Sequence, residues 1–137
     1  MDKDLDIVVY GATGFTGKLC VKYLTENAKD LRWAIAGRDL TKLSQVAIRF
    51  STKTETLVAE GGDESALDAI TSRTKVIIST AGPFHRYGSK LVASCVKNST
   101  HYVDITGETF WIKDMIDKHH SEAAPKLILN VTKFVCF

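Results

Sequence analysis

The chain has 137 residues, the usual size of one globular domain, and its 18 basic and 16 acidic residues give a formal net charge of +2. Hydrophobic residues make up 45% and charged residues 25% of the chain, which excludes the collagen, coiled-coil and disordered classes. The balanced charge also excludes a general attraction to nucleic acid or to an acidic membrane. Any anion site therefore has to be local.

Three cysteines lie far apart in the sequence, at Cys20, Cys95 and Cys136. This spacing matches neither a disulfide framework nor a paired metal motif, and it favours a reducing, intracellular compartment. The acidic start of the chain, residues 2–6, is unlike a secretory signal or a transit peptide. No apolar run approaches the roughly 18 residues that a membrane-spanning helix needs.

Short apolar runs alternate with helically spaced segments along the whole chain. The runs predict strands at 5–10, 31–36, 54–59, 75–79, 100–103 and 126–130. The helical spacing predicts helices at 15–28, 40–50, 64–72, 87–97 and 108–124. Because alternating strands and helices form parallel sheets that are covered on both faces, the sequence predicts an α/β fold, a doubly wound parallel sheet in three αβα layers.

Three glycines, Gly11, Gly14 and Gly17, separate the first strand from the first helix. Gly11 permits a sharp exit from the strand, Gly14 lets a pyrophosphate approach the backbone, and Gly17 lets the helix pack closely. The start of the helix offers free N–H groups to a phosphate. This context predicts dinucleotide binding, with a purely structural turn as the alternative. A mononucleotide P-loop is excluded because five residues separate Gly11 from Gly17 and Leu19 follows Lys18.

The end of the second predicted strand carries the residue expected to select the cofactor. In dinucleotide-binding folds this position contacts the adenosine ribose, and an arginine there accommodates the 2′-phosphate of NADP. Arg38 therefore favours NADP, with NAD possible, and the alternative is a solvated arginine. Asp39 is expected to N-cap the next helix. Asp63, after the third strand, is expected to be an N-cap, an adenine contact, or both.

The segment after the fourth strand is expected to face the nicotinamide half of the cofactor, since ligands lie beyond the ends of strands one and four in such a sheet. Its candidate contacts are Ala81, Gly82, Pro83 and Phe84. The alternative for Phe84 is a place in the core. His85, Arg86 and Tyr87 add aromatic and cationic groups at the expected mouth of the site.

No catalytic residue stands out from the sequence. His85, Tyr87 and His101 are candidates by their chemistry alone. The Tyr-x-x-x-Lys pair of short-chain dehydrogenases is absent, because Lys90 follows Tyr87 after only three positions. The His-rich stretch 119–122 lacks metal-ligand spacing, since adjacent residues of a helix face different directions, so no metal site is expected.

Four motifs, taken in order, resemble the saccharopine dehydrogenase-like oxidoreductases, to which the trans-acting enoyl reductases of glycolipid synthesis are related. They are VYGATGFTG at 9–17, AGR at 36–38, TAGPF at 80–84 and YVDITGE at 102–108. The resemblance extends to about Val131 and implies a Rossmann domain with NAD(P)-dependent oxidoreductase activity. By this resemblance the pyrophosphate cradle consists of Gly11, Thr13, Gly14, Phe15, Thr16 and Gly17, with Arg38 at the ribose phosphate and residues 81–84 at the nicotinamide half.

The chain departs from the family pattern after its last predicted strand. Relatives are expected to continue into a second domain that holds the substrate pocket, whereas this chain continues with 132–137. We therefore expect 1–131 to be the dinucleotide-binding domain and 132–137 a divergent tail of a truncated form. The apolar tail from Phe134 is expected to favour self-association.

The predicted function is that of the cofactor-binding domain of an oxidoreductase, and the alternative is a non-catalytic NADP-binding sensor. The expected partners are the dinucleotide and a small-molecule or lipid-like substrate, and no nucleic acid is expected. The resemblance alone implies a location at lipid droplets, membranes or mitochondria.

Overall fold

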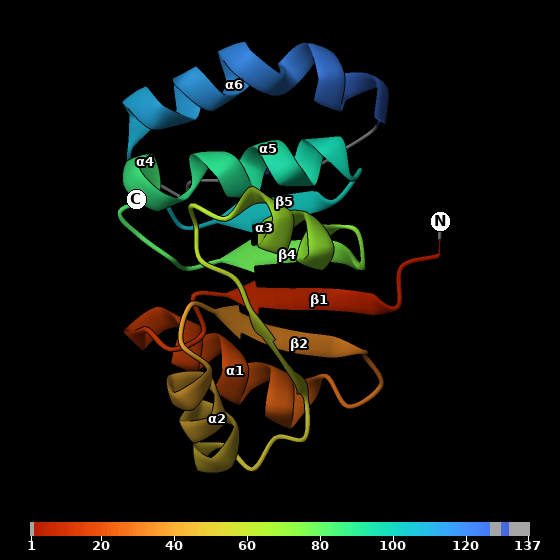
Figure 1. The fold of residues 1–137 in the computed structure, drawn as a ribbon, viewed down its shortest axis with the longest axis vertical. Coiled ribbons are helices and arrows are strands. Elements are labelled where there is room, and N and C mark those ends of the chain that lie inside the picture. Colours follow the sequence, from red (N-terminus) through yellow and green to blue (C-terminus); the bar gives the residue numbers. More distant parts are fainter. Residues whose placement is uncertain (1, 127–129, 132–137) are drawn as a thin grey trace.

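The strands of the chain form one parallel sheet (Figure 1). The computed structural model describes residues 2–126 and 130–131, and within them the sheet order is β3-β2-β1-β4-β5-β6. The strands are β1 (Leu5–Tyr10), β2 (Trp33–Gly37), β3 (Glu55–Val58), β4 (Thr74–Ser79), β5 (His101–Asp104) and β6 (Asn130–Val131). The chain order reverses between β1 and β4, which makes a topological switch point at the carboxyl ends of these strands.

Helices cover both faces of the sheet, and this confirms the predicted three layers. They are α1 (Phe15–Asn27), α2 (Leu40–Arg49), α3 (Glu64–Thr71), α4 (Phe84–Tyr87), α5 (Ser89–Lys97) and α6 (Thr109–Ala123), with a short 3₁₀ turn at Ala124–Lys126. Val21 of α1 and Leu43 of α2 pack in one core cluster. Leu67 of α3, Leu91 of α5 and Trp111 of α6 pack in the other. Within residues 2–126, no helix is both long and apolar enough to cross a membrane.

The position of β1 in the middle of the sheet explains why its sequence is apolar at successive positions. Val8 and Val9 are both fully buried, and they belong to different core clusters. Successive side chains of a strand point to opposite faces, so both positions have to be apolar when helices cover both faces. The continuous apolar run at 7–9 therefore follows from the double layer of helices.

The predicted helix 87–97 is wrong at its start, since α4 and α5 occupy this region as two helices that meet at Gly88. A Cβ at Gly88 would lie 2.8 Å from the Phe84 carbonyl oxygen and 2.8 Å from the Trp111 ring. The close packing of this ring against the junction is a tertiary contact that helical periodicity does not report. The predicted last strand, 126–130, overlaps β6 at Asn130, while 127–129 and the tail 132–137 lie outside the described residues.

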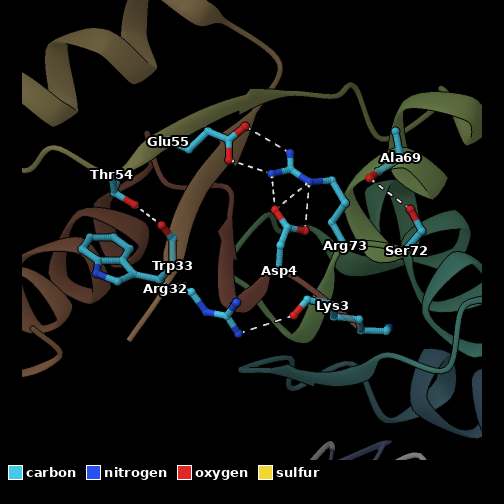
Figure 2. Close-up of polar contacts among 9 residues, drawn as sticks. All are labelled: Lys3, Asp4, Arg32, Trp33, Thr54, Glu55, Ala69, Ser72 and Arg73. Carbon is cyan, nitrogen blue, oxygen red and sulfur yellow. Dashed lines mark hydrogen bonds and ion pairs between the residues drawn. The ribbon is translucent and has the colours of Figure 1, made fainter. Parts of the chain in front are cut away.

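The amino-terminal edge of the sheet is held by ion pairs (Figure 2). Arg73, just before β4, places Nη2 2.6 Å from Asp4 Oδ2 and 2.9 Å from Glu55 Oε2. Asp6 in β1 accepts from Lys75 Nζ at 2.8 Å. Arg73 and Lys75 therefore both have carboxylate partners at this edge.

Candidate functional site

The turn after β1 has a backbone that requires glycine at its first position. Gly11 has a φ of +82°, and a Cβ there would lie 2.8 Å from the backbone nitrogen of Ala81. The Gly11 N–H donates to the Ala36 carbonyl of β2 at 2.9 Å. The turn therefore packs between the end of β2 and the loop after β4. The positive φ expected at Gly11 is confirmed.

Gly17 and Gly14 are glycines for different reasons. A Cβ on Gly17 would lie 2.2 Å from the Gly11 carbonyl oxygen, so α1 begins in direct contact with the backbone of the turn. Gly14, the N-cap residue of α1, has an ordinary φ of −77°, and a Cβ there would meet no protein atom closer than 3.5 Å. The fold does not require glycine at position 14, and this is expected of a position kept small for a ligand.

The start of α1 is open to an anion. Within the part of the chain that the structure describes, no side chain caps this helix, and its first turn contains no acidic residue. The first N–H groups of a helix have no partner within the helix, and they carry a partial positive charge. The turn therefore presents unsatisfied donors beside Gly14.

A cavity of about 690 Å³ lies at the carboxyl edge of the sheet, next to this turn. Its volume is within the usual range for small-molecule and cofactor sites. It extends from the ends of β2 and β3, at Gly37 and Gly61, to the loop after β4, at Gly82. The sequence-predicted site residues that line it are Gly11, Thr13, Gly14, Arg38, Ala81 and Gly82.

The other predicted site residues lie around the cavity without lining it. Phe15 is 82% exposed at the start of α1, Thr16 follows it on the same helix, and Gly17 is buried. Pro83 is the N-cap residue of α4. Their contacts with a cofactor stay predictions.

Asp63 and Phe84 both match the structural alternatives considered for them. Asp63 Oδ1 accepts from the Ala66 N–H at 3.0 Å and caps α3. Phe84 is buried, with its ring centroid 5.9 Å from that of Trp111. The cofactor contacts predicted for these two side chains remain predictions. The N-cap expected at Asp39 is confirmed, since its carboxylate accepts from the Lys42 N–H at 3.0 Å.

Two arginines of the cavity wall have no ion-pair partner among residues 2–126, although Glu60 also lines the cavity. Arg38 and Arg86 line it, and neither guanidinium has a hydrogen bond or ion pair with any residue in 2–126. Lys90 also lines the cavity, but its Nζ donates to the Gly62 carbonyl at 3.0 Å and lies 3.3 Å from Glu64 Oε1. Unpaired guanidinium groups attract anions such as phosphate, and they offer forked donors to them.

Thr80 and Tyr10 lie within the motifs at 80–84 and 9–17, but the sequence assigned neither side chain a role in the site. Thr80 Oγ1 donates to the carbonyls of Tyr10 at 3.1 Å and Gly11 at 3.0 Å, so it ties the loop after β4 to the glycine turn. The Tyr10 hydroxyl donates to the Ala59 carbonyl at 3.2 Å. The signal for Thr80 was its place directly after a strand at the switch point.

Glu108 was also missed as a site residue, although it ends the fourth motif. Its carboxylate accepts the N–H of Phe84 at 3.0 Å, the N–H of His85 at 2.7 Å, and lies 2.9 Å from His85 Nδ1. Burial acts to raise the pKa of Glu108, but the hydrogen bonds from His85 and Phe84 outweigh it and hold the pKa below its ordinary value. Only the fold brings residue 108 beside residues 84 and 85.

A buried polar chain supports the loop that carries Glu108. The Tyr102 hydroxyl donates to Asp104 Oδ2 at 2.7 Å, and the Thr106 N–H donates to Asp104 Oδ1 at 3.0 Å. The Glu108 N–H in turn donates to Thr106 Oγ1 at 3.1 Å. Burial raises the pKa of Asp104 in spite of the two hydrogen bonds that it accepts.

Of the candidates named for their chemistry alone, the structure places His85 and Tyr87 at the cavity. His101 is the first residue of β5 and lies at the opposite, amino-terminal edge of the sheet. Within residues 2–126 and 130–131, no group of three or more His, Cys, Asp or Glu side chains could hold a metal ion.

The arrangement fits a dinucleotide. The cavity spans the switch point, Gly14 and the uncapped start of α1 suit a pyrophosphate, and Arg38 stands at the end of β2 where a ribose 2′-phosphate would lie. Thr13 and Gly82 line the same cavity.

Comparison with known proteins identifies relatives of the whole domain. Trans-acting enoyl reductases of Mycobacterium leprae and Mycobacterium tuberculosis are 39% and 37% identical over 125 and 126 residues. These alignments cover 89% and 90% of this chain, and the chain spans only 30% of the length of either relative.

Solved structures share the fold at low sequence identity. The saccharopine dehydrogenase (L-Glu forming) of Saccharomyces cerevisiae superposes with a TM-score of 0.65 at 21% identity, over 82% of this chain and 24% of that chain. The triphenylmethane reductase of Citrobacter sp., complexed with NADP(H), superposes with a TM-score of 0.67 at 13% identity, over 90% of this chain and 46% of that chain.

The family model described as the saccharopine dehydrogenase NADP binding domain matches residues 7–129, nearly the whole chain. The expected resemblance and the expected NADP cofactor are thereby confirmed. The chain belongs to the saccharopine dehydrogenase NADP-binding domain family, an oxidoreductase family, and its cofactor is NADP.

Proposed function

We propose that residues 1–131 form the NADP-binding domain of a reductase whose substrate is an apolar, lipid-like molecule with an enoyl group. One observation carries the cofactor part of this proposal. The guanidinium of Arg38 faces the cavity from the end of β2 with no partner in residues 2–126, and the same cavity reaches the glycine turn. NADP differs from NAD by a phosphate at the position where this arginine stands.

We assign each residue around the cavity a role in cofactor binding from its position. The backbone of residues 11–17 holds the pyrophosphate against the start of α1, and Arg38 holds the 2′-phosphate. The loop at 81–84 borders the nicotinamide half, with its small residues Ala81 and Gly82 on the cavity wall. Asp63 fixes the start of α3 beside the adenosine end.

The chemistry supplied by the bound cofactor is hydride transfer, and the protein contributes orientation. The name of the mycobacterial relatives, trans-acting enoyl reductase, supports a carbon–carbon double bond as the group reduced. Exposed apolar side chains at the carboxyl edge, Ile105 and Phe110, support an apolar substrate. The proposed lipid link is also what supports a location at lipid droplets, membranes or mitochondria.

Calorimetric titration of the chain with NADP⁺ and with NAD⁺ tests the cofactor part. We expect NADP⁺ to bind about tenfold more tightly or better, because one charge-assisted phosphate contact contributes about 1.5–3 kcal/mol. Equal affinities would contradict the role of Arg38. Oxidation of NADPH in the presence of an enoyl thioester tests the reductase part.

A second candidate function is a non-catalytic NADP sensor. Phe15 is 82% exposed directly beside the glycine turn, and Phe110 is 66% exposed beside His85, so a partner surface borders the cofactor cavity. A sensor would change its association state when NADP⁺ binds, and it would not oxidise NADPH with any enoyl thioester. Sedimentation with and without NADP⁺ separates the two functions, and it also tests self-association.

A further inference from the structure

His85 lines the cavity, and its ring is held from two sides. Glu108 Oε2 lies 2.9 Å from His85 Nδ1. The ring of Phe110 lies on another side, with its centroid 5.7 Å from the imidazole centroid and an interplanar angle of 58°. The histidine side chain is still 41% exposed. It is therefore oriented by its neighbours and accessible to a ligand.

The contact with Glu108 determines which ring nitrogen carries the hydrogen. The Glu108 carboxylate already accepts two backbone N–H groups, and the hydrogen bonds keep it ionised. An ionised carboxylate has no proton to donate, so His85 Nδ1 must be the donor. In the neutral ring this leaves a lone pair on Nε2, and no protein group in residues 2–126 hydrogen-bonds to that atom.

The position of His85 along the cavity places it away from the adenosine end. Arg38 and Gly61 mark the ends of β2 and β3, whereas His85 follows β4, on the other side of the switch point. In a doubly wound sheet, a dinucleotide with its adenosine beyond β2 extends its nicotinamide towards β4. His85 is therefore the imidazole nearest to the reacting half of the cofactor in this topology.

Resting on the proposed function, we propose that His85 is the acid–base group at the nicotinamide end of the cavity and that Glu108 is its positioning residue. In the reductive direction the Nε2–H bond of the charged ring breaks, and its electron pair stays on the imidazole. The proton bonds to the substrate atom next to the carbon that accepts the hydride. The double bond is reduced, NADPH is oxidised to NADP⁺, and the ring regains a proton from water.

Glu108 serves this step in both states of the ring. Its Oε2 accepts the Nδ1–H hydrogen bond before and after the transfer, so the ring keeps its orientation and Nε2 returns to the same place. A purely structural Glu108, which only capped the backbone of α4, would leave the reactivity of His85 Nε2 independent of the carboxylate. The two roles therefore differ in a measurable property of the imidazole.

Carbethoxylation with diethyl pyrocarbonate reports on that property, because the reagent is attacked by an unprotonated imidazole nitrogen. The whole chain is treated alone, with NADP⁺, or with adenosine 2′,5′-bisphosphate, and each histidine is followed by peptide mass spectrometry. We expect NADP⁺ at about ten times its Kd to slow the modification of His85 about tenfold by occupancy. The bisphosphate, which fills only the adenosine end, should not protect His85, and His119 and His120 on α6 should be unaffected by either ligand.

Two outcomes overturn the placement of His85: no protection by NADP⁺, or equal protection by the bisphosphate. Calorimetry on the same samples distinguishes this failure from a failure of the proposed function. If NADP⁺ does not bind, the proposed function fails. If NADP⁺ binds and His85 stays reactive, only the inference about His85 fails.

Glu108→Gln tests the positioning role, and Glu122→Gln on α6, which loses the 2.8 Å contact with Lys126, is the matched control. At about pH 8.5, above the ordinary histidine pKa of about 6.5, we expect His85 modification to slow about tenfold in Glu108→Gln and to stay unchanged in the control. Nitrogen-15 NMR of labelled histidine should show the Nδ1–H tautomer of neutral His85 in the unaltered chain and its loss in Glu108→Gln. If the variant does not fold, an Nε2–H tautomer in the unaltered chain would by itself overturn the proposal.

Discussion

The two edges of the same sheet differ in whether Arg73 and Arg38 have carboxylate partners. At the amino-terminal edge, Arg73 is paired with Asp4 and Glu55 (Figure 2). Lys75 is paired with Asp6 at the same edge. At the carboxyl-terminal edge, on the left of Figure 1, Arg38 faces a cavity without a carboxylate partner in residues 2–126. Both edges are formed by the ends of the same strands, so the sheet itself does not determine which arginines are paired.

This contrast separates charges that hold the fold from charges that await a ligand. A surface ion pair contributes little stability, but it satisfies both of its members and leaves no net attraction for an outside anion. A guanidinium left unpaired beside an uncapped helix start retains that attraction. That Arg38 has no partner among residues 2–126 is therefore more informative about function than its charge.

Filling the space behind the glycine turn should destabilise the chain most. Gly17→Ala places a Cβ 2.2 Å from the Gly11 carbonyl oxygen, so the backbone of the turn has to move. We expect the free energy of unfolding to fall by about 1–3 kcal/mol, the usual cost of overpacking, and NADP⁺ binding to weaken with it. Denaturant unfolding and calorimetry measure both.

Gly107→Ala is the matched control, because a Cβ there meets no atom within 4 Å. Its free energy of unfolding should stay within about 0.5 kcal/mol of the unaltered chain. A stable Gly17→Ala variant with unchanged affinity would show that the close contact at the turn does not shape the site.

Arg38→Ala tests the role of the unpaired arginine at the carboxyl-terminal edge. The affinity for NADP⁺ should fall by about 10–100-fold, and that for NAD⁺ should change little, because only NADP presents a phosphate to this guanidinium. Melting temperatures should be unaltered in the absence of cofactor. Equal losses for the two dinucleotides would remove Arg38 from the phosphate site.

Arg73→Ala tests the ion pairs at the amino-terminal edge. It removes the contacts with Asp4 and Glu55, and we expect the melting temperature to fall by only about 1–3 °C, since these groups are largely exposed. The affinity for NADP⁺ should not change. A marked loss of NADP⁺ binding in this variant would mean that the two edges are coupled.

Acid titration should change the free energy of unfolding in opposite directions through the carboxylates of the two edges. Hydrogen bonds from Arg73 and Lys75 lower the pKa values of Asp4 and Asp6. Their stabilisation is present above the unfolded aspartate pKa of about 3.9 and is lost as the pH falls through the lowered folded values. Burial raises the pKa of Asp104, so its contribution is present below about 3.9 and is lost as the pH rises through the raised value.

Unfolding measured from pH 2 to 7 checks the loss of stability at low pH from Asp4 and Asp6 and the loss at higher pH from Asp104. Asp104→Asn is the variant that removes the second effect. Asparagine keeps an acceptor for the Thr106 N–H and a partner for the Tyr102 hydroxyl, so the fold should persist. The loss of stability above pH 4 that Asp104 causes should then disappear. An unchanged pH profile in Asp104→Asn would contradict the raised pKa.

The sequence predicted a residue's role correctly where that role depends on residues a few positions away in the chain. Gly11 after a strand, Asp39 before a helix and the apolar pair Val8–Val9 all matched their predictions, because turn geometry, capping and burial on two faces depend on short spacings. The break at Gly88 did not show in the pattern, since it depends on the ring of Trp111, 23 positions away.

The strands, the helices other than α4, the glycine turn and the position of Arg38 could be predicted, because each depends on residues close together in the chain. Three features could be learned only from the folded chain: Arg38 has no partner within the described residues, Phe84 lies in the core, and Glu108 holds His85. These are contacts between residues far apart in the chain, and periodicity carries no information about which distant side chains meet. The charge of a residue can be predicted from the sequence, whereas its pairing depends on the fold.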